Sequence, residues 1–126
     1  MKSPFWEKAQ DEARAARLLA DAGCFAAAVS RAYYAMLNAA RAALEQSGTP
    51  TSDIRTHGGL NRMFSKHVIL ARGLDQELGR ILRRTEKIRL LSDYSAEGID
   101  GDRVRSILAS MDAFLDSLSK IVEEGR

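Results

Sequence analysis

Apolar residues recur every three or four positions along most of the chain, the spacing that places them on one face of an α-helix. The stripe is regular in the second segment, at Phe25, Val29, Tyr33, Met36, Ala40 and Leu44. Alanines occupy many positions between these residues, and small side chains let neighbouring helices approach closely. We therefore expect this segment, which Gly48 and Pro50 end, to be the central helix of a bundle.

The other segments have recognisable boundaries. Ser3 before Pro4 is typical of a helix start, and Gly23 of a helix end, so a first helix is predicted from about residue 4 to about residue 22. After a connection over residues 49–58, apolar residues predict a short third helix that Gly73 separates from the next, at Leu60, Met63, Phe64 and Val68.

Two long helices are predicted in the second half, joined by a polar connection from Ser95 to Gly101. The apolar stripe of the fourth helix is Leu78, Ile81, Leu82, Thr85, Ile88 and Leu91. The stripe of the fifth is Val104, Ile107, Leu108, Met111, Phe114, Leu115, Leu118, Ile121 and Val122. No strand pattern or repeat occurs. The fold predicted for residues 1–126 is a single all-α domain, an up-and-down antiparallel bundle of four long helices and one short helix.

Composition narrows the class of protein. A chain of 126 residues with 45% hydrophobic and 29% charged residues is typical of one globular domain. No apolar run reaches the roughly 20 residues of a membrane span, and the N-terminal segment turns charged before an export signal could form, so we expect a cytoplasmic protein without a membrane partner. Cys24 lacks a second thiol, and His57 and His67 lack the spacing of two ligands on one helical face. We expect no metal and no cofactor, and we expect Cys24 to pack as a small apolar residue.

The net charge of +2 conceals an uneven distribution. Residues 1–54 balance, residues 90–126 carry four basic against eight acidic groups, and residues 55–89 carry nine against three. The nine are Arg55, Arg62, Lys66, Arg72, Arg80, Arg83, Arg84, Lys87 and Arg89. Such a segment suits an anionic partner such as RNA, a nucleotide or an acidic protein, although a solvated helix face would have the same composition.

Arg89 is an anomaly, because on a helical projection it falls in the same arc as the apolar residues of the fourth helix. A buried guanidinium needs a partner, and Asp93 one turn later is the local candidate. Arg89 thus either forms an internal ion pair with Asp93 or is a functional arginine. On the second helix, Arg31, Tyr34 and Asn38 converge on the side away from Val29 and Met36, a side that could be solvent, a dimer contact or a pocket wall.

These residues together resemble a known family. The stretch Ser30-Arg-Ala-Tyr-Tyr-Ala-Met-Leu-Asn-Ala-Ala-Arg-Ala-Ala-Leu44 closely resembles the central helix of HEPN domains. The segments 22–29 and 56–60 with Phe64, and Arg89 followed by Asp93-Tyr94, resemble the small prokaryotic branch. The resemblance implies an antiparallel helical bundle, commonly a homodimer, often paired with a minimal nucleotidyltransferase as toxin and antitoxin.

The resemblance also implies chemistry, because many HEPN proteins are metal-independent ribonucleases that use an arginine followed after four to six residues by a histidine. Here Arg89 is followed after four residues by Tyr94, and Asn38 stands where relatives often carry histidine. Tyrosine, with a reference pKa near 10, is a poor base at pH 7. Arg62 and His67 do have the literal spacing, but a chain with 14 arginines can produce it by chance.

Three functions remain open at this stage. In the first, the protein is a nucleotide-, RNA- or partner-binding component whose cleft includes Arg31, Tyr34, Asn38, Arg62, Arg89, Asp93 and Tyr94. In the second, it is a ribonuclease in which Arg89 binds the scissile phosphate and His57 or His67 carries the proton. His57 could equally cap the short helix. In the third, the bundle is only a dimerising scaffold.

Overall fold

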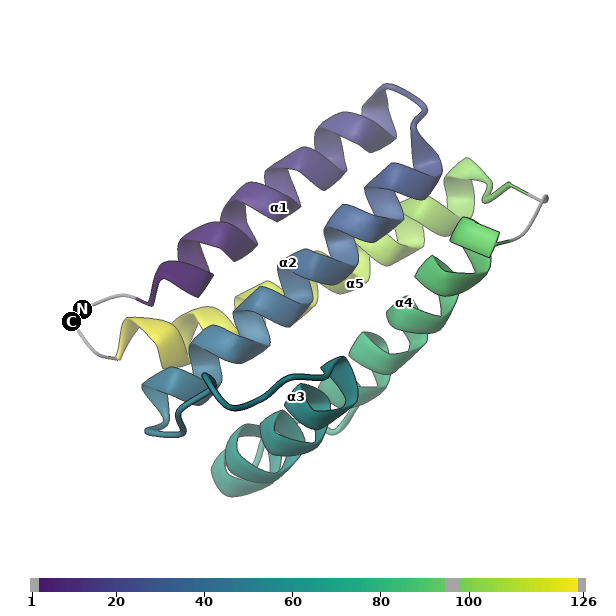
Figure 1. Ribbon diagram of the computed structural model, residues 1–126. Helices are drawn as coiled ribbons and strands as arrows, with labels where there is room; N and C mark the ends of the chain where they lie inside the picture. Colours follow the sequence, from purple (N-terminus) through teal and green to yellow (C-terminus); the bar gives the residue numbers. More distant parts are fainter. Residues whose placement is uncertain (1–2, 95–97, 125–126) are drawn as a thin grey trace.

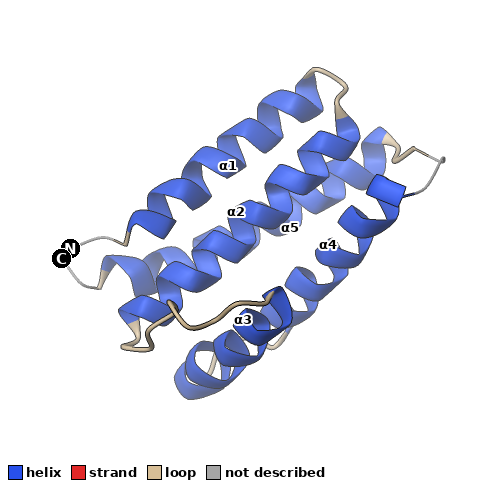
Figure 2. Ribbon diagram, in the orientation of Figure 1, coloured by secondary structure: helices blue, strands red, loops and turns tan. Residues whose placement is uncertain are grey.

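The computed structural model describes residues 3–94 and 98–124, with the backbone alone at Tyr94 (Figure 1). Every regular element in these ranges is helical (Figure 2). The elements are α1 (Pro4–Asp21), α2 (Phe25–Gln46), α3 (His57–Phe64), the π-helical turn η1 (Ser65–Leu70), α4 (Glu77–Tyr94) and α5 (Gly101–Glu123). The predicted all-α bundle is therefore confirmed.

Helix α2 is the central helix, as its alanine-rich sequence predicts. It packs against α1, α3, η1, α4 and α5, and Figure 1 shows it running between α1 and α4. Twelve of its residues are buried, and seven of these are alanines. Because alanine side chains are small, several helices can pack closely around α2. Helix α2 therefore fixes where the neighbouring helices and their side chains lie.

The predicted starts and ends of α1 and α2 have the expected physical causes. The hydroxyl of Ser3 accepts a hydrogen bond from the backbone N–H of Phe5 at 3.2 Å, which caps α1 ahead of Pro4. Gly23 and Gly48 follow the ends of α1 and α2 with φ of +80° and +87°, a backbone conformation that favours glycine.

The third helix is longer than predicted. The side chain of Thr56 caps α3 by accepting from the N–H of Gly59 at 2.9 Å, so the helix begins at His57. It then continues without a break into the π-helical turn η1. The spacing of apolar residues does not predict this π-helical turn, because such a turn shifts the apolar stripe of the helix by only one residue.

Two packing predictions were wrong. Cys24 is exposed, because it lies in the turn between α1 and α2 at the N-cap of α2. Leu91 is 67% exposed, although Leu78 and Leu82 of the same predicted stripe are buried. The stripe runs from Thr85 to Ile88 and from Ile88 to Leu91 in steps of three residues, and each step falls about 60° short of a full helical turn. The two shortfalls add up and turn Leu91 away from the core.

Within the described residues, no helix is both long enough and apolar enough to cross a membrane.

Candidate functional site

Side chains from α2, α3 and α4 meet in a group that we call the tyrosine–arginine cluster: Tyr33, Tyr34, His57, Glu86 and Arg89. The rings of the two adjacent tyrosines lie 5.3 Å apart, edge to face. The imidazole of His57 lies 5.5 Å from the ring of Tyr33 and 5.9 Å from that of Tyr34. The first residue of α3 is therefore held against the middle of α2.

Arg89 packs on the same two rings. Its guanidinium carbon lies 5.2 Å from the ring centre of Tyr33 and 5.5 Å from that of Tyr34, within the range of cation–π attraction. Its Nη1 donates to Oδ2 of Asp93 at 3.3 Å, which confirms the predicted pair. Only 14% of the side chain is exposed. The apolar arc of α4 thus admits an arginine because two aromatic faces and one carboxylate surround its charge.

Glu86 links Tyr33 to His57. The hydroxyl of Tyr33 donates to one carboxylate oxygen of Glu86 at 3.0 Å, and the other oxygen lies 3.9 Å from Nδ1 of His57. Tyr33 is fully buried, and this burial, together with the negative charge of Glu86, raises its pKa well above the ordinary value near 10. Tyr33 is consequently a neutral donor that orients Glu86 toward the imidazole.

The structure excludes a capping role for His57. Thr56 provides the cap of α3, so His57 does not serve as the cap. The imidazole lies in the tyrosine–arginine cluster and is about one-third exposed. His57 and Arg89, 32 positions apart, therefore pack against the same two tyrosine rings.

The polar group predicted on α2 is brought together in part. The guanidinium of Arg31 lies 5.2 Å from the ring centre of Tyr34 and pairs with Glu12 of α1 at 2.9 Å. Asn38 is half-buried one turn beyond Tyr34 and makes no hydrogen bond with the described residues. The side chain of Tyr94 lies outside the described part of the chain.

Arg62 and His67, the literal Arg-x4-His match, are not brought together by any described contact. Arg62 is exposed on α3, whereas His67 is half-buried on η1. Arg62 lines a surface groove that His67 does not line. The π-helical turn begins between them, so four intervening residues do not place the two side chains as they would on a regular α-helix.

That surface depression, which we call the α3–α4 groove, consists of two adjoining hollows of about 480 and 300 Å³. They share Ser65, Leu70 and Arg83. The whole groove is lined by Gly58, Asn61, Arg62, Ser65, Lys66, Ile69, Leu70, Gln76, Gly79, Arg80, Arg83 and Glu86. Glu86 belongs to both the groove and the tyrosine–arginine cluster, so the two features adjoin.

The charges of this groove are mostly positive and mostly uncompensated. Arg62, Lys66 and Arg83 are exposed and form no ion pair with a described carboxylate, whereas Arg80 pairs with Glu77. The exposed face of α4 thus has the basic character that its sequence predicts. An anion placed in the groove would meet several unpaired cations.

Sequence reasoning missed three residues of these features. The sequence pattern places Tyr33 among the apolar residues of α2, although a buried tyrosine hydroxyl normally requires a hydrogen-bond partner. Glu86 reads as one of three acids in a basic segment. Asn61 is only 9% exposed, and its carboxamide oxygen has no hydrogen-bond partner among the described residues. Neither Glu86 nor Asn61 has a sequence signal that would single it out.

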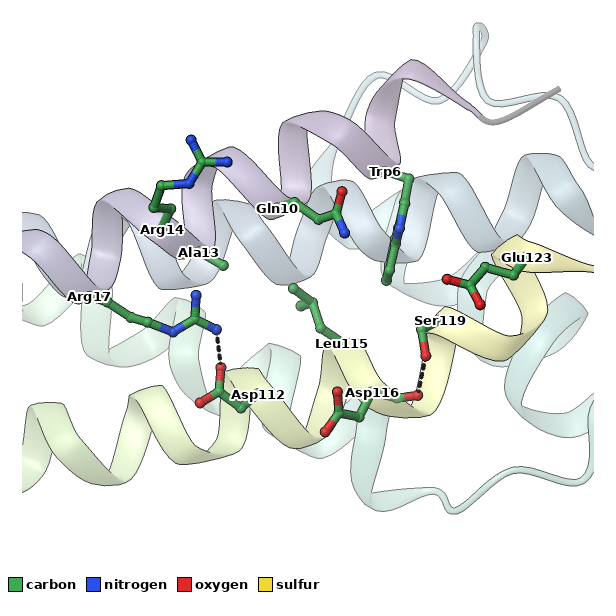
Figure 3. A pocket seen from close by; sticks show the side chains of 10 residues that line it. All are labelled: Trp6, Gln10, Ala13, Arg14, Arg17, Asp112, Leu115, Asp116, Ser119 and Glu123. Atoms are coloured by element: carbon green, nitrogen blue, oxygen red, sulfur yellow. Dashed lines mark hydrogen bonds and ion pairs between the residues drawn. The ribbon is translucent and has the colours of Figure 1, made fainter.

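A separate hollow of about 460 Å³ lies between α1 and α5 (Figure 3). Arg17 and Asp112 pair across it at 2.5 Å, and the indole of Trp6 lies at one end. Its charged lining residues are Arg14, Arg17, Asp112, Asp116 and Glu123. The charges of this hollow nearly cancel, and none of its residues belongs to the tyrosine–arginine cluster or the α3–α4 groove.

No group of three or more His, Cys, Asp or Glu residues in the described ranges could hold a metal ion. The tyrosine–arginine cluster offers an imidazole that faces a carboxylate and a guanidinium that is stacked on aromatic rings.

A helical bundle with Arg89 of α4 packed on the paired tyrosines of α2 agrees with the class of protein that the sequence resembles. A family model for the HEPN domain matches residues 3–122, so the chain belongs to the HEPN family. It is 38% identical over 88 residues to the UPF0332 protein glr0978 of Gloeobacter violaceus, covering 70% of this chain and 68% of that protein. It is 27% identical over 118 residues to a Methanocaldococcus jannaschii protein named "Putative toxin MJ0605", covering 94% of this chain and 86% of that protein.

Proposed function

We propose that this HEPN protein is the RNA- or nucleotide-binding component of a toxin–antitoxin type pair. The observation that carries the proposal is the convergence of Arg62, Lys66 and Arg83, none paired with a described carboxylate, on one groove beside the tyrosine–arginine cluster. These three cations outnumber Glu86, the one carboxylate among the lining residues, and such an excess of guanidinium and ammonium groups favours a phosphate-bearing ligand.

The toxin part of the proposal draws on family membership. One relative, which the chain matches along most of its length, is named "Putative toxin MJ0605". The HEPN resemblance further suggests a nucleotidyltransferase as partner and a homodimer as the assembly. We propose this partner and this assembly for the protein.

Binding is favoured over catalysis by the state of Arg89. Its guanidinium is stacked on Tyr33 and Tyr34, bonded to Asp93 and largely buried. With 14% of its side chain exposed, Arg89 offers little surface to a scissile phosphate. After four intervening residues, the family motif has Tyr94 here, which supplies no ready base at neutral pH.

A second candidate function, a metal-independent ribonuclease, is supported by one observation: Glu86 faces the imidazole of His57 beside Arg89. An imidazole oriented by a carboxylate can take the proton of a ribose 2′-hydroxyl. The 2′-oxygen then bonds to phosphorus as the bond to the 5′-oxygen breaks, and the departing 5′-oxygen takes a proton from water, leaving a 2′,3′-cyclic phosphate and a 5′-hydroxyl. Arg89 would stabilise the charge that develops on the phosphate oxygens.

One experiment separates the two functions. Labelled RNA is incubated with the purified protein in EDTA, and binding and cleavage are both followed for the wild type, His57→Gln and His67→Gln. Binding without cleavage is the expected result. Cleavage that His57→Gln abolishes and His67→Gln retains would establish the ribonuclease with His57 as the proton carrier. Absence of both binding and cleavage would overturn the RNA proposal.

The partner proposal has its own test. The protein is co-expressed with a candidate nucleotidyltransferase from a neighbouring gene, and the mass of the purified product is measured by light scattering. A stable complex is expected. Without the nucleotidyltransferase, the protein alone should have twice the mass of one chain. A monomer that binds no such partner would contradict both assembly proposals.

A further inference from the structure

Another hollow, of about 300 Å³, lies between α4 and α5, and we call it the α4–α5 hollow. It shares no residue with the α3–α4 groove, since Arg83 lines the groove and Arg84, the next residue, lines this hollow. On the α5 side its charged residue is Arg103. Its lining also includes two serines and two isoleucines: Ser106, Ser110, Ile88 and Ile107. No described carboxylate lines it, so every charge that a ligand would meet there is positive.

Both guanidinium groups of the hollow are accessible. Arg103 lies in the first turn of α5, where the helix dipole disfavours a positive charge. It is exposed and forms no ion pair with a described carboxylate, whereas Arg105 pairs with Asp102. Arg84 does pair with Glu77, at 3.3 Å, but about half of each side chain is exposed, and such a pair contributes little energy. An anion in the hollow would therefore meet two guanidinium groups.

The two serines add hydrogen-bond donors. Ser106 and Ser110 lie one turn apart on α5, and neither hydroxyl makes a hydrogen bond with the described residues. A serine within a helix can donate to a backbone carbonyl of the preceding turn, as Ser117 of the same helix does at 2.9 Å. The hydroxyl of Thr85, which also lines the hollow, is likewise engaged, with a carbonyl of α4 at 2.8 Å. Ser106 and Ser110 thus keep their donors for a ligand.

The remaining surface of the hollow is apolar. Ile107 is only 5% exposed, and Ile88 is half-buried. Apolar surroundings strengthen hydrogen bonds between charged groups, because they lower the local dielectric constant. The volume lies at the lower end of the range for small-ligand sites. The hollow therefore suits a small molecule that combines an anionic group with an apolar one.

We propose that the α4–α5 hollow binds a phosphate monoester. A phosphate group has three acceptor oxygens and up to two negative charges, which match two guanidinium groups and two hydroxyls better than the single charge of a carboxylate does. Arg84, Arg103 and the two serines bind the phosphate, and the isoleucines pack against the organic group. This site is independent of the proposed function, because none of its residues lines the α3–α4 groove.

Titration of isotope-labelled protein tests the ligand class. The probes are inorganic phosphate, phenyl phosphate and benzoate, and NMR follows the backbone amides of Arg103, Ser106 and Ser110. Phenyl phosphate should cause saturable shifts, inorganic phosphate should bind more weakly because it lacks the ring, and benzoate should bind at least about fivefold more weakly than phenyl phosphate. Benzoate that binds as tightly as phenyl phosphate, or amides that no probe shifts, would overturn the proposal.

Variants on the same helix give matched controls. Arg103→Gln should weaken phenyl phosphate binding about tenfold, whereas Arg105→Gln removes the same charge outside the hollow and should change it less than about twofold. Ser110→Ala should weaken binding about threefold, and Ser117→Ala should leave it unchanged. Equal effects of the two arginine variants would show that the probe responds to net charge, and would overturn the site.

The phosphate can belong to a free small ester or to the 5′ end of an RNA, and two oligonucleotides of one sequence separate these sources. Tighter binding of the 5′-phosphorylated form than of the 5′-hydroxyl form, lost in Arg103→Gln, would assign the RNA end. Equal binding of the two forms, with phenyl phosphate still bound, would assign a free ester. Failure of the 5′-hydroxyl RNA to bind would count against the proposed function and leave this site standing.

Discussion

At the scale of single residues, Arg89 illustrates how a charge can belong to a core. Two tyrosine faces receive the guanidinium plane, and Asp93, which is itself partly exposed, neutralises it. The arrangement uses the planar shape of arginine as well as its charge, so lysine would not be an equivalent residue at this position.

Replacing Arg89 by alanine should therefore lower stability. The variant loses two cation–π contacts and the packing of the long side chain, while Asp93 remains accessible to water, so we expect a loss of about 2 kcal/mol in the free energy of unfolding. Urea denaturation measures it. Arg84→Ala removes an exposed arginine paired with Glu77 and should change the same quantity by less than about 0.5 kcal/mol. Equal effects of the two variants would contradict the internal role of Arg89.

Tyr33 gives a prediction about pH. Its pKa is raised in the folded protein, while in the unfolded chain it titrates near 10. Above pH 10 the unfolded state therefore releases a proton that the folded state keeps, so stability should fall as the pH rises, by about 1.4 kcal/mol per pH unit. Below pH 10 this contribution is constant.

Urea denaturation at several values between pH 9 and pH 11 measures this slope, and Tyr33→Phe provides the control. The variant lacks the titrating hydroxyl, so its stability should fall less steeply in this range. At neutral pH it should lose about 1 kcal/mol, because Glu86 loses its donor. Parallel pH profiles of the two proteins would show that Tyr33 ionises freely in the folded state.

The sequence predicts some residues of the site and not others, for a physical reason. Arg89 can be found because it breaks an apolar arc, and Asp93 because it lies one helical turn away. Both are local signals within one helix. The contacts of His57 and Glu86 with Tyr33 join three helices, and helical periodicity contains no information about which faces meet across elements.

At the scale of elements, the ends of the helices depend on backbone conformation. Gly48, directly after the C-cap of α2, has φ of +87°, and no atom lies within 4 Å of the position that a β-carbon would take. A β-carbon at this position would not clash with any atom. Any loss of stability on adding it must therefore come from the left-handed backbone conformation. This glycine starts the connection that leads to α3.

Gly48→Ala should consequently destabilise the protein by about 1 to 2 kcal/mol, the cost of a left-handed conformation in a residue with a β-carbon. Gly58→Ala is the control, because that residue lies on α3 without a positive φ and an added β-carbon would meet only Nη1 of Arg62, at 3.6 Å. It should have no effect or a slightly stabilising one. Thermal or urea unfolding measures both, and a Gly48→Ala variant as stable as the wild type would contradict the argument.

Elements were predictable to the extent that their causes are local. The bounds of α1 and α2 follow from a cap, a proline and two glycines. The π-helical turn escaped prediction because its distinguishing feature is one backbone hydrogen-bond shift, and Leu91 was misplaced because successive three-residue steps drift around the helix. Long periodic segments are therefore predicted more securely than the irregular turns beside which ligands bind.

At the scale of the whole molecule, the uneven charge of the sequence acquires a location. The basic segment 55–89 supplies exposed cations to α3, η1 and α4, whereas the acidic segment 90–126 supplies Asp112, Asp116 and Glu123 to the hollow between α1 and α5. The two hollows thus have different electrostatic character, although the net charge is only +2. An anionic strand should be attracted to the α3–α4 side.

The salt dependence of RNA binding tests this distribution. Four exposed cations of α3, η1 and α4 have no described carboxylate partner: Arg62, Lys66 and Arg83 line the groove, and Lys87 lies one helical turn after Arg83 on α4. If each neutralises one phosphate of a single strand, the logarithm of the association constant should fall with the logarithm of salt concentration with a slope of about −3. Fluorescence anisotropy at several salt concentrations measures it. Lys66→Gln and Lys87→Gln should each make the slope less steep by about 0.7, whereas Lys120→Gln on α5 should leave it unchanged. Equal effects of all three variants would mean that RNA responds to net charge alone and that this face has no special role.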